Sequence, residues 1–294
     1  MTAKLLDGKW VRDQLLAEAR PRIERLPRPP GIAVVLVGHN PASEVYVRNK
    51  VKACEETGVY SEKYTPGEDA TTEELLALVE SLNRDPEIDG ILVQMPLPKQ
   101  IDTSRVLMAV SPDKDVDGFH PLNVGYLSTM RPGLRPCTPS GVMEILRRYE
   151  IPVAGKIAVV VGRSDIVGKP MAMLLLNANA TVTICHSKTA QLAEVCRRAD
   201  ILVAAIGRAA MITAEFIGEG ATVIDVGMNR TSEELAASTG RKAGALIGDV
   251  HPIDVVNRAG AYTPVPGGVG PLTIAMLMLN TIQSAERRLG LCIS

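Results

Sequence analysis

The chain has 294 residues, 46% of them hydrophobic, and its 32 basic residues are balanced by 33 acidic ones. This length allows two domains of ordinary size, and the apolar content allows each domain to bury a core. The balanced charge gives no signal for nucleic acid or for a membrane surface, and no apolar run is long enough to span a bilayer.

Cysteine usage and the N-terminal residues indicate the compartment. Five scattered cysteines without a C-x-x-C pair are typical of reduced thiols rather than of a disulfide framework or a zinc site. The first residues carry charges where a signal peptide needs an apolar core. We therefore expect a cytoplasmic protein.

The first part of the chain alternates short apolar runs with helical patterns. Strands are predicted at 32–37, 59–64 and 88–98, and helices at 10–25, after Asn40 with Pro41 in the first helical position, and after the cap-like pair Thr71 and Glu74. This alternation predicts a parallel α/β sheet.

Two positions in this half are candidate site residues. Tyr46 and Lys50 lie four residues apart, so in a helix they share one face just after a strand ends and a cleft opens. From spacing alone, a solvated lysine on a surface helix is the simpler interpretation. Gln94 stands where the strand should end, beside Pro96 and Pro98. It either faces a ligand crevice or bonds nearby backbone.

The segment 111–125 contains Asp115 and Asp117, two residues apart before a glycine. The spacing loosely resembles a calcium loop, but the later ligands and the closing glutamate are missing, so we expect no metal site. The segment is either an acidic turn or the source of a carboxylate that accepts hydrogen bonds from a polar heterocycle.

A second structural block begins after residues 131–141, which are rich in proline and glycine and predict the crossing between two domains. A helix is predicted at 142–149. Residues 157–176 then read as strand, glycine turn and helix, the arrangement of a dinucleotide site. The spacing G-x-S-x-x-V-G-x-P departs from the standard fingerprint, so alone it is weak evidence.

The strand expected at 181–185 ends without the acid that would accept hydrogen bonds from the ribose hydroxyls of NAD. Arg163 in the glycine turn and Ser187 after the strand can reach a 2′-phosphate together, which favours NADP. The alternative is a solvated turn arginine and a serine that caps a helix.

The remaining elements continue the sheet and close the chain. We expect strands at 201–206 and 222–227, a polar surface excursion at 228–243, a short helix after 252, and a helix at 272–289. Segment 263–271 holds three prolines and three glycines, so we expect neither helix nor central strand there, but room for a flat ligand.

Eight segments, in order, carry a more specific signal than any one of them alone. They are YVRNK (46–50), GILVQMPLP (90–98), KDVDGFHPLNVG (114–125), RPCTPSG (135–141), GRSDIVGKP (162–170), CHSKT (185–189), VIDVGMNR (223–230) and TPVPGGVGP (263–271). Together they span nearly the whole chain and closely resemble the bifunctional methylenetetrahydrofolate dehydrogenase/cyclohydrolase family.

The resemblance implies a two-lobed α/β fold. Residues 1–140 and 272–294 would form a folate-binding catalytic domain, and 141–271 a Rossmann-like NADP-binding domain, with the last helix packing back on the first lobe. It also implies NADP-dependent oxidation of 5,10-methylenetetrahydrofolate to the methenyl form and hydrolysis to 10-formyltetrahydrofolate, in one-carbon metabolism. Family members are commonly homodimers.

The resemblance also assigns roles to residues. It implies that Lys50 is the catalytic acid or base, helped by Tyr46 and Gln94, and that Asp117 anchors the pterin ring. The implied folate-binding set is Tyr46, Lys50, Val93, Gln94, Met95, Asp117, Pro266, Gly267, Gly268, Val269 and Gly270. The implied NADP contacts are Gly162, Arg163, Ser164, Ser187 and Met228.

The two reactions make different demands on these residues. Hydride leaves a carbon between two nitrogens whose lone pairs stabilise the cation, so positioning does most of the work. Hydrolysis needs a group that shuttles protons, and we assign that role to Lys50.

Three alternatives are weaker. Short-chain dehydrogenases also use Tyr-x-x-x-Lys, but after the nucleotide turn, whereas Tyr46 precedes it here. A shikimate- or amino-acid-dehydrogenase-like protein leaves VQMPLP and PGGVGP without a role. A binding module with lapsed catalysis would be favoured by an altered Lys50, and Lys50 is present.

Overall fold

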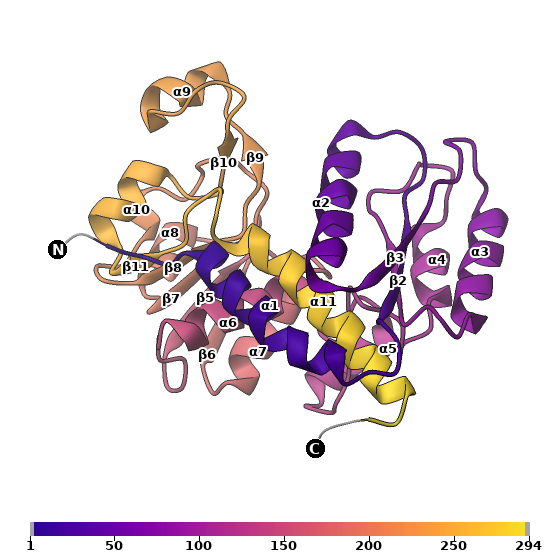
Figure 1. Ribbon diagram of the computed structural model, residues 1–294. Coiled ribbons are helices and arrows are strands. Elements are labelled where there is room, and N and C mark those ends of the chain that lie inside the picture. Colours follow the sequence, from indigo (N-terminus) through magenta and orange to yellow (C-terminus); the bar gives the residue numbers. More distant parts are fainter. Residues whose placement is uncertain (1–2, 292–294) are drawn as a thin grey trace. The chain divides into compact units, whose positions relative to one another are not determined.

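The computed structural model describes residues 3–291, which form two compact units, each with its own parallel sheet (Figure 1). The six-stranded unit comprises the residues up to Asp13 and Thr138–Thr273, with a six-stranded sheet. The three-stranded unit comprises Gln14–Cys137 and the residues from Ile274 onward. Each unit therefore joins segments that are far apart in the sequence.

The sheet of the three-stranded unit has β2 (Gly31–Val35) between β3 (Tyr60–Tyr64) and β4 (Gly90–Val93), and both pairs are parallel. Every residue of β2 and β4 is buried, whereas β3 forms a partly exposed edge. Continuous apolar runs suit strands that are covered on both faces. The parallel α/β arrangement predicted for this part of the chain is confirmed.

Helices α1 (Gly8–Glu24), α2 (Pro41–Thr57) and α3 (Thr72–Arg84) match the three helices predicted in this region. α3 has the predicted capping box, because Glu74 N donates to Thr71 Oγ1 at 3.2 Å and Thr71 N donates to Glu74 Oε2 at 2.8 Å. Two short helices, α4 (Thr103–Ala109) and α5 (Pro121–Ser128), have no counterpart among the predicted elements.

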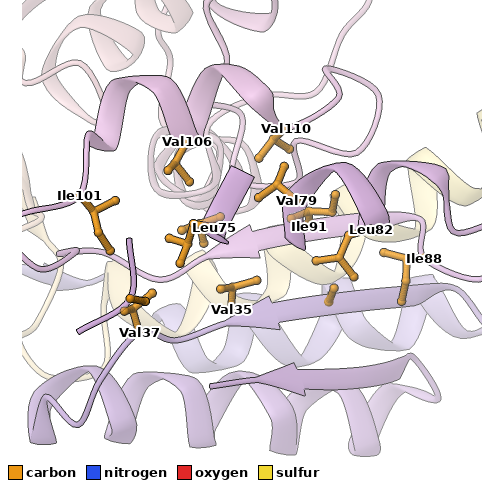
Figure 2. Packing of buried hydrophobic residues seen from close by; sticks show 13 residues of the cluster. Val35, Val37, Leu75, Val79, Leu82, Ile88, Ile91, Ile101, Val106 and Val110 are labelled. Carbon is orange, nitrogen blue, oxygen red and sulfur yellow. The ribbon is translucent and has the colours of Figure 1, made fainter. Parts of the chain in front are cut away.

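One hydrophobic cluster of this unit lies between its sheet and helices α3 and α4, and another includes residues of α2 and α11 (Val269–Arg288). Figure 2 shows Leu75, Val79 and Leu82 of α3 pointing toward the strands that carry Val35 and Ile91, and all five are buried. The spacing of the three leucine and valine residues puts them on one face of the helix. This packing fixes β2 and β4, whose carboxyl ends carry candidate site residues.

Helix α11 (Val269–Arg288) brings the end of the chain into the three-stranded unit. Asn280 Nδ2 donates to Val116 O at 2.7 Å, and Ser284 Oγ donates to Asp89 O at 2.6 Å. These bonds give side-chain donors of α11 to backbone carbonyls of the three-stranded unit. The prediction that the last helix packs back on the first lobe is confirmed.

The six-stranded unit has strand order β1-β11-β8-β7-β5-β6, and every neighbouring pair is parallel. Its strands are β1 (Lys4–Leu5), β5 (Ile157–Val161), β6 (Thr181–Cys185), β7 (Ile201–Ala204), β8 (Thr222–Asp225) and β11 (Ala261–Tyr262). β6 and β7 pair with opposite edges of β5, so the direction in which the chain adds strands to the sheet reverses there. Such a topological switch point is where nucleotides bind in doubly wound sheets.

The other elements of this unit are mostly helical. They are α6 (Cys137–Arg148), α7 (Gly168–Asn177), α8 (Leu192–Arg197), the 3₁₀ turn η1 (Ala214–Phe216), α9 (Glu233–Thr239) and α10 (Pro252–Arg258). The antiparallel pair β9 (Asn229–Arg230) and β10 (Leu246–Ile247) encloses α9 in the sequence. This segment forms the predicted excursion after β8.

Two helices begin earlier than predicted. α6 begins at Cys137 rather than at residue 142, and α11 begins at Val269, inside the segment expected to lack helix. In both cases the proline, Pro139 or Pro271, takes the third helical position. The first-turn N–H groups have no intrahelical partner, so proline sacrifices no bond there. Among the described residues, no helix combines the length and apolarity needed to cross a membrane.

Candidate active site and nucleotide-binding loops

The start of α2 sets the position of the first candidate pair. Asn40 Oδ1 accepts a hydrogen bond from Ser43 N at 3.1 Å, and α2 begins at Pro41, as predicted. Tyr46 and Lys50 then lie one turn apart on the helix. Tyr46 is exposed and Lys50 is half-buried.

Lys50 contacts the end of β4. Its Nζ donates to Gln94 Oε1 at 3.1 Å. Gln94 N donates to Val35 O at 2.8 Å, and Gln94 Nε2 donates to Met95 O at 2.7 Å. Gln94 therefore bonds nearby backbone, as one of the two alternatives considered from the sequence has it, and its side-chain oxygen also holds Lys50. Val93 and Met95 flank Gln94 on either side.

The two aspartates of the 114–118 loop have different roles. Asp115 is buried, and its carboxylate accepts from His120 N at 2.8 Å, Phe119 N at 3.2 Å and Asn123 Nδ2 at 2.9 Å. These bonds use the carboxylate to shape the turn into α5. The acidic-turn interpretation therefore holds for Asp115 and leaves Asp117 as the candidate for ligand binding.

Asp117 is electrostatically coupled to Lys50. Burial raises the pKa of the Asp117 carboxyl to about 6, while the charge of Lys50 acts to lower it and that of Asp115 to raise it. A carboxyl that titrates near neutral pH beside an ammonium is typical of a functional site. The three-stranded unit thus gathers Lys50, Gln94 and Asp117 from a helix, a strand end and a loop.

The shifted pKa of Asp117 makes stability depend on pH. Because folding raises this pKa from 3.8 to about 6, the folded state binds more protons between these values, and stability falls as pH rises through them. We expect Asp117→Asn to be more stable than the natural chain at neutral pH, by up to about 3 kcal/mol. Thermal unfolding at neutral pH and below the ordinary aspartate pKa checks this. The gain should vanish at the lower pH, and a gain at both would contradict the assignment.

The glycine turn after β5 lies at the switch point of the larger sheet. Gly162 has φ +135°, and a Cβ there would lie 2.1 Å from Ala205 O, so only glycine fits. Gly162 N donates to Cys185 O at 2.9 Å, which ties the turn to the end of β6. The turn is thereby wedged between the ends of two strands.

Ser164 shapes the start of α7. Its Oγ accepts hydrogen bonds from Val167 N and Gly168 N, both at 3.2 Å. Arg163 and Ser187 are exposed, and each lies two residues beyond the register pair formed by β5 and β6 at their carboxyl ends. The two residues named for a 2′-phosphate therefore occupy matching positions in the loops that follow two adjacent strands.

The segment 266–270, to which the family resemblance gives folate contacts, belongs to the six-stranded unit and not to the unit of Lys50 and Gln94. A Cβ on Gly270 would lie 3.4 Å from Met228 Cε, so the segment lies against a residue assigned to NADP. A Cβ on Gly268 would lie 2.5 Å from Pro264 O. Because position 268 is glycine, the backbone there can pack closely against the backbone of residue 264.

Two buried carboxylates were absent from the predicted site. Asp225 ends β8 and Asp249 follows β10, and both are buried. Burial raises the pKa of Asp225 to about 7, against hydrogen bonds from Val250 N, Asp249 N and Gly227 N that lower it. The sequence feature that could have pointed to Asp225 was an acidic residue at the end of an otherwise apolar strand. The described residues contain no group of three or more His, Cys, Asp or Glu side chains able to hold a metal ion.

One unit has a doubly wound sheet with a glycine turn at its switch point. The other unit carries a lysine that interacts with a glutamine and an aspartate. Together these features define a nucleotide-binding enzyme with a separate catalytic unit. The model of the tetrahydrofolate dehydrogenase/cyclohydrolase catalytic domain matches residues 6–117, and that of the corresponding NAD(P)-binding domain matches residues 136–289. The chain belongs to the tetrahydrofolate dehydrogenase/cyclohydrolase family.

Individual relatives are similar over nearly their whole length. The bifunctional protein FolD of Solibacter usitatus (strain Ellin6076) is 64% identical, over 98% of this chain and 99% of the relative. The FolD structure from Campylobacter jejuni has a TM-score of 0.92 at 46% identity, over 97% of this chain and 99% of that one. The Trypanosoma brucei FolD structure, complexed with NADP cofactor and inhibitor, has a TM-score of 0.89 at 37% identity, over 98% and 99%.

Proposed function

We propose that the two activities of the family depend on different residues of this chain. The chain is a bifunctional methylenetetrahydrofolate dehydrogenase and methenyltetrahydrofolate cyclohydrolase. It oxidises 5,10-methylenetetrahydrofolate with NADP and hydrolyses the 5,10-methenyl product to 10-formyltetrahydrofolate. The observation that carries the division of labour is the 3.1 Å hydrogen bond between Lys50 and Gln94, which supplies a held proton carrier.

In the dehydrogenase step, bound NADP accepts the hydride. The protein's part is to hold the folate and the nicotinamide at a fixed distance, and such positioning can supply roughly 7–11 kcal/mol of the barrier at best. Asp117 holds the pterin ring through its carboxylate, which matches the N–H donors of the heterocycle. No proton transfer by Lys50 is needed for hydride to leave.

In the cyclohydrolase step, water adds to the methenyl carbon and loses a proton, and the bond from that carbon to one nitrogen breaks as the nitrogen gains a proton. Lys50 of α2, half-buried and hydrogen-bonded to Gln94 just after β4, carries the proton between these sites. Gln94 Oε1 orients the Lys50 ammonium, and Tyr46, one turn earlier, assists it.

NADP contacts are proposed for Gly162, Arg163, Ser164, Ser187 and Met228, and folate contacts for Tyr46, Lys50, Val93, Gln94, Met95, Asp117 and Pro266–Gly270. The functional domains proposed are 1–140 with 272–294 for folate and 141–271 for NADP. The compact units divide the chain near these bounds, but the residues up to Asp13 go with the nucleotide-binding segment.

Arg163→Ala should weaken the preference for NADP over NAD. A bond from a guanidinium to a phosphate is charge-assisted, so its loss should lower kcat/KM for NADP by about tenfold or more, while kcat/KM for NAD changes little. Steady-state kinetics with both cofactors measure the ratio. Arg197→Ala removes an exposed arginine of α8 in the same unit and serves as the control. An equal fall with both cofactors would remove Arg163 from the 2′-phosphate site.

The overall assignment is tested by mixing the purified chain with methylenetetrahydrofolate and either NADP or NAD. Reduced cofactor and the methenyl intermediate are followed by their separate absorbances, and the formyl product by chromatography. NADP reduction with formyl product and little free methenyl species supports both activities. A preference for NAD would overturn the cofactor choice but keep the family. Binding without turnover in a folded chain would instead support the lapsed module.

We also propose that the chain is a cytoplasmic homodimer. The resemblance to the family supports the dimer, and β3, the edge strand of its sheet, leaves backbone groups that a second strand can pair. Sedimentation equilibrium should give twice the chain mass of 31.4 kDa. A monomer at micromolar concentration would reject the dimer, and recovery in a membrane or secreted fraction would reject the cytoplasm.

A further inference from the structure

Three consecutive backbone amides after β7 converge on one buried carboxylate. Asp249 Oδ2 accepts from Ile206 N at 2.6 Å and from Gly207 N at 2.9 Å, and Asp249 Oδ1 accepts from Arg208 N at 2.9 Å. Asp249 is 0% exposed. Successive amides arranged in this way form a nest that binds anions, and here an internal carboxylate fills it.

The same carboxylate reaches the loop after β8. Asp249 Oδ1 also accepts from Asn229 Nδ2 at 2.9 Å, and Asn229 directly follows Met228. Asp225 completes the connection, because its carboxyl accepts from Gly227 N at 2.9 Å and from Asp249 N at 2.8 Å. Hydrogen bonds therefore join the loops after β7, β8 and β10 at the carboxyl edge of the sheet.

The backbone packs against the carboxyl groups of Asp225 and Asp249 so closely that there is no room for a side chain. A Cβ on Gly227 would lie 2.3 Å from Asp249 N, and a Cβ on Gly248 would lie 1.8 Å from Asp225 Oδ2. The backbone can approach the carboxylates this closely only because both positions are glycine.

We propose that Asp249 is a positioning residue for the cofactor. Its carboxylate fills the anion nest after β7, so the cofactor phosphates bind at the glycine turn after β5 instead. Through its hydrogen bond with Asn229, it also fixes the loop that carries Met228. The proposal rests on the assignment of Met228 and the glycine turn to NADP. Asp249 is fully buried, so it acts through the loops that it holds and not by direct contact with the cofactor.

The test is Asp249→Asn, which keeps the size of the side chain but turns an NH₂ toward amide donors. The dissociation constant of NADP, measured by calorimetry, and the KM for NADP should rise by about tenfold or more. Cyclohydrolase activity, assayed on methenyltetrahydrofolate without NADP, should stay within about twofold, because the residues proposed to move its protons, Lys50, Tyr46 and Gln94, lie in the other unit. A purely structural role would lower both activities together.

Asp89→Asn is the matched control. Asp89 is also 0% exposed, accepts from Gly31 N and pairs with Arg28, but it lies in the three-stranded unit. The substitution Asp89→Asn should lower the melting temperature of the chain without changing its affinity for NADP. If Asp249→Asn does not fold, Asn229→Ala removes only the donor beside Met228 and should still raise the KM for NADP.

Unchanged NADP affinity in Asp249→Asn, or in Asn229→Ala where the first variant does not fold, would overturn the proposal. A parallel loss of both activities would do the same. Failure of the proposed function shows separately, as absence of NADP binding or turnover in the natural chain.

Discussion

Replacing Lys50 by methionine should abolish cyclohydrolase activity and spare a good part of hydride transfer. Removing a positioned proton carrier costs about 10²–10⁴-fold in the step that needs it. The hydride step needs positioning, which Asp117 and the folate segments still supply. Methionine keeps an unbranched side chain that is one atom shorter, but it cannot donate to Gln94 Oε1 as Lys50 does at 3.1 Å. Both rates are measured on one preparation, with methylene and methenyl substrates.

Lys52→Met is the control for this change. Lys52 lies on the same helix, is exposed, and pairs only loosely with Glu56, at 3.7 Å. A surface ion pair of this kind contributes little, so both activities should persist. Equal loss of the two activities in folded Lys50→Met would argue that Lys50 binds substrate rather than moving protons.

Replacing Asp117 by alanine should sharply lower folate affinity while NADP affinity changes little. Hydrogen bonds to an ionised group are worth about 1.5–3 kcal/mol each, which corresponds to about 10-fold to 100-fold in the dissociation constant. Calorimetric titration with methylenetetrahydrofolate and, separately, with NADP measures both. Because the pKa of Asp117 is about 6, folate affinity of the natural chain should also fall as pH drops below that value.

Asp113→Ala removes a nearby exposed carboxylate and should leave both affinities unchanged. If Asp117→Ala instead weakened NADP and left folate binding intact, Asp117 would have no place in the pterin pocket. A pH profile that persists in Asp117→Ala would point to another titrating group.

The sequence was a good guide to the long elements and a poor one to the short ones. Strands such as β2 and β5 are continuous apolar runs, and their burial enforces the pattern. β1 and β11 have two residues each, and two residues carry no period. The early starts of α6 and α11 were missed because proline reads as a breaker, whereas in a first turn it sacrifices no hydrogen bond.

The candidate site divides in the same way. Motifs located Lys50, Gln94 and Asp117, but only the fold shows that Lys50 and Gln94, 44 residues apart, share a hydrogen bond. Spacing alone could not assign different roles to Asp115 and Asp117, because the difference lies in which donors each one meets. Asp249 was missed for the same reason, since its donors come from residues 206–208 and from Asn229.

Because α11 belongs in part to the three-stranded unit, the translation of that unit is completed after the translation of the six-stranded unit. The Asp89 carbonyl accepts a hydrogen bond from Ser284, and the Val116 carbonyl accepts one from Asn280 in addition to one from Cys137. Asn280 and Ser284 are synthesised only after the whole six-stranded unit. All residues of the six-stranded unit have been translated once Thr273 has been added. Domains fold as units during synthesis, so the chain can complete its nucleotide-binding sheet while the Lys50 unit still lacks its last helix.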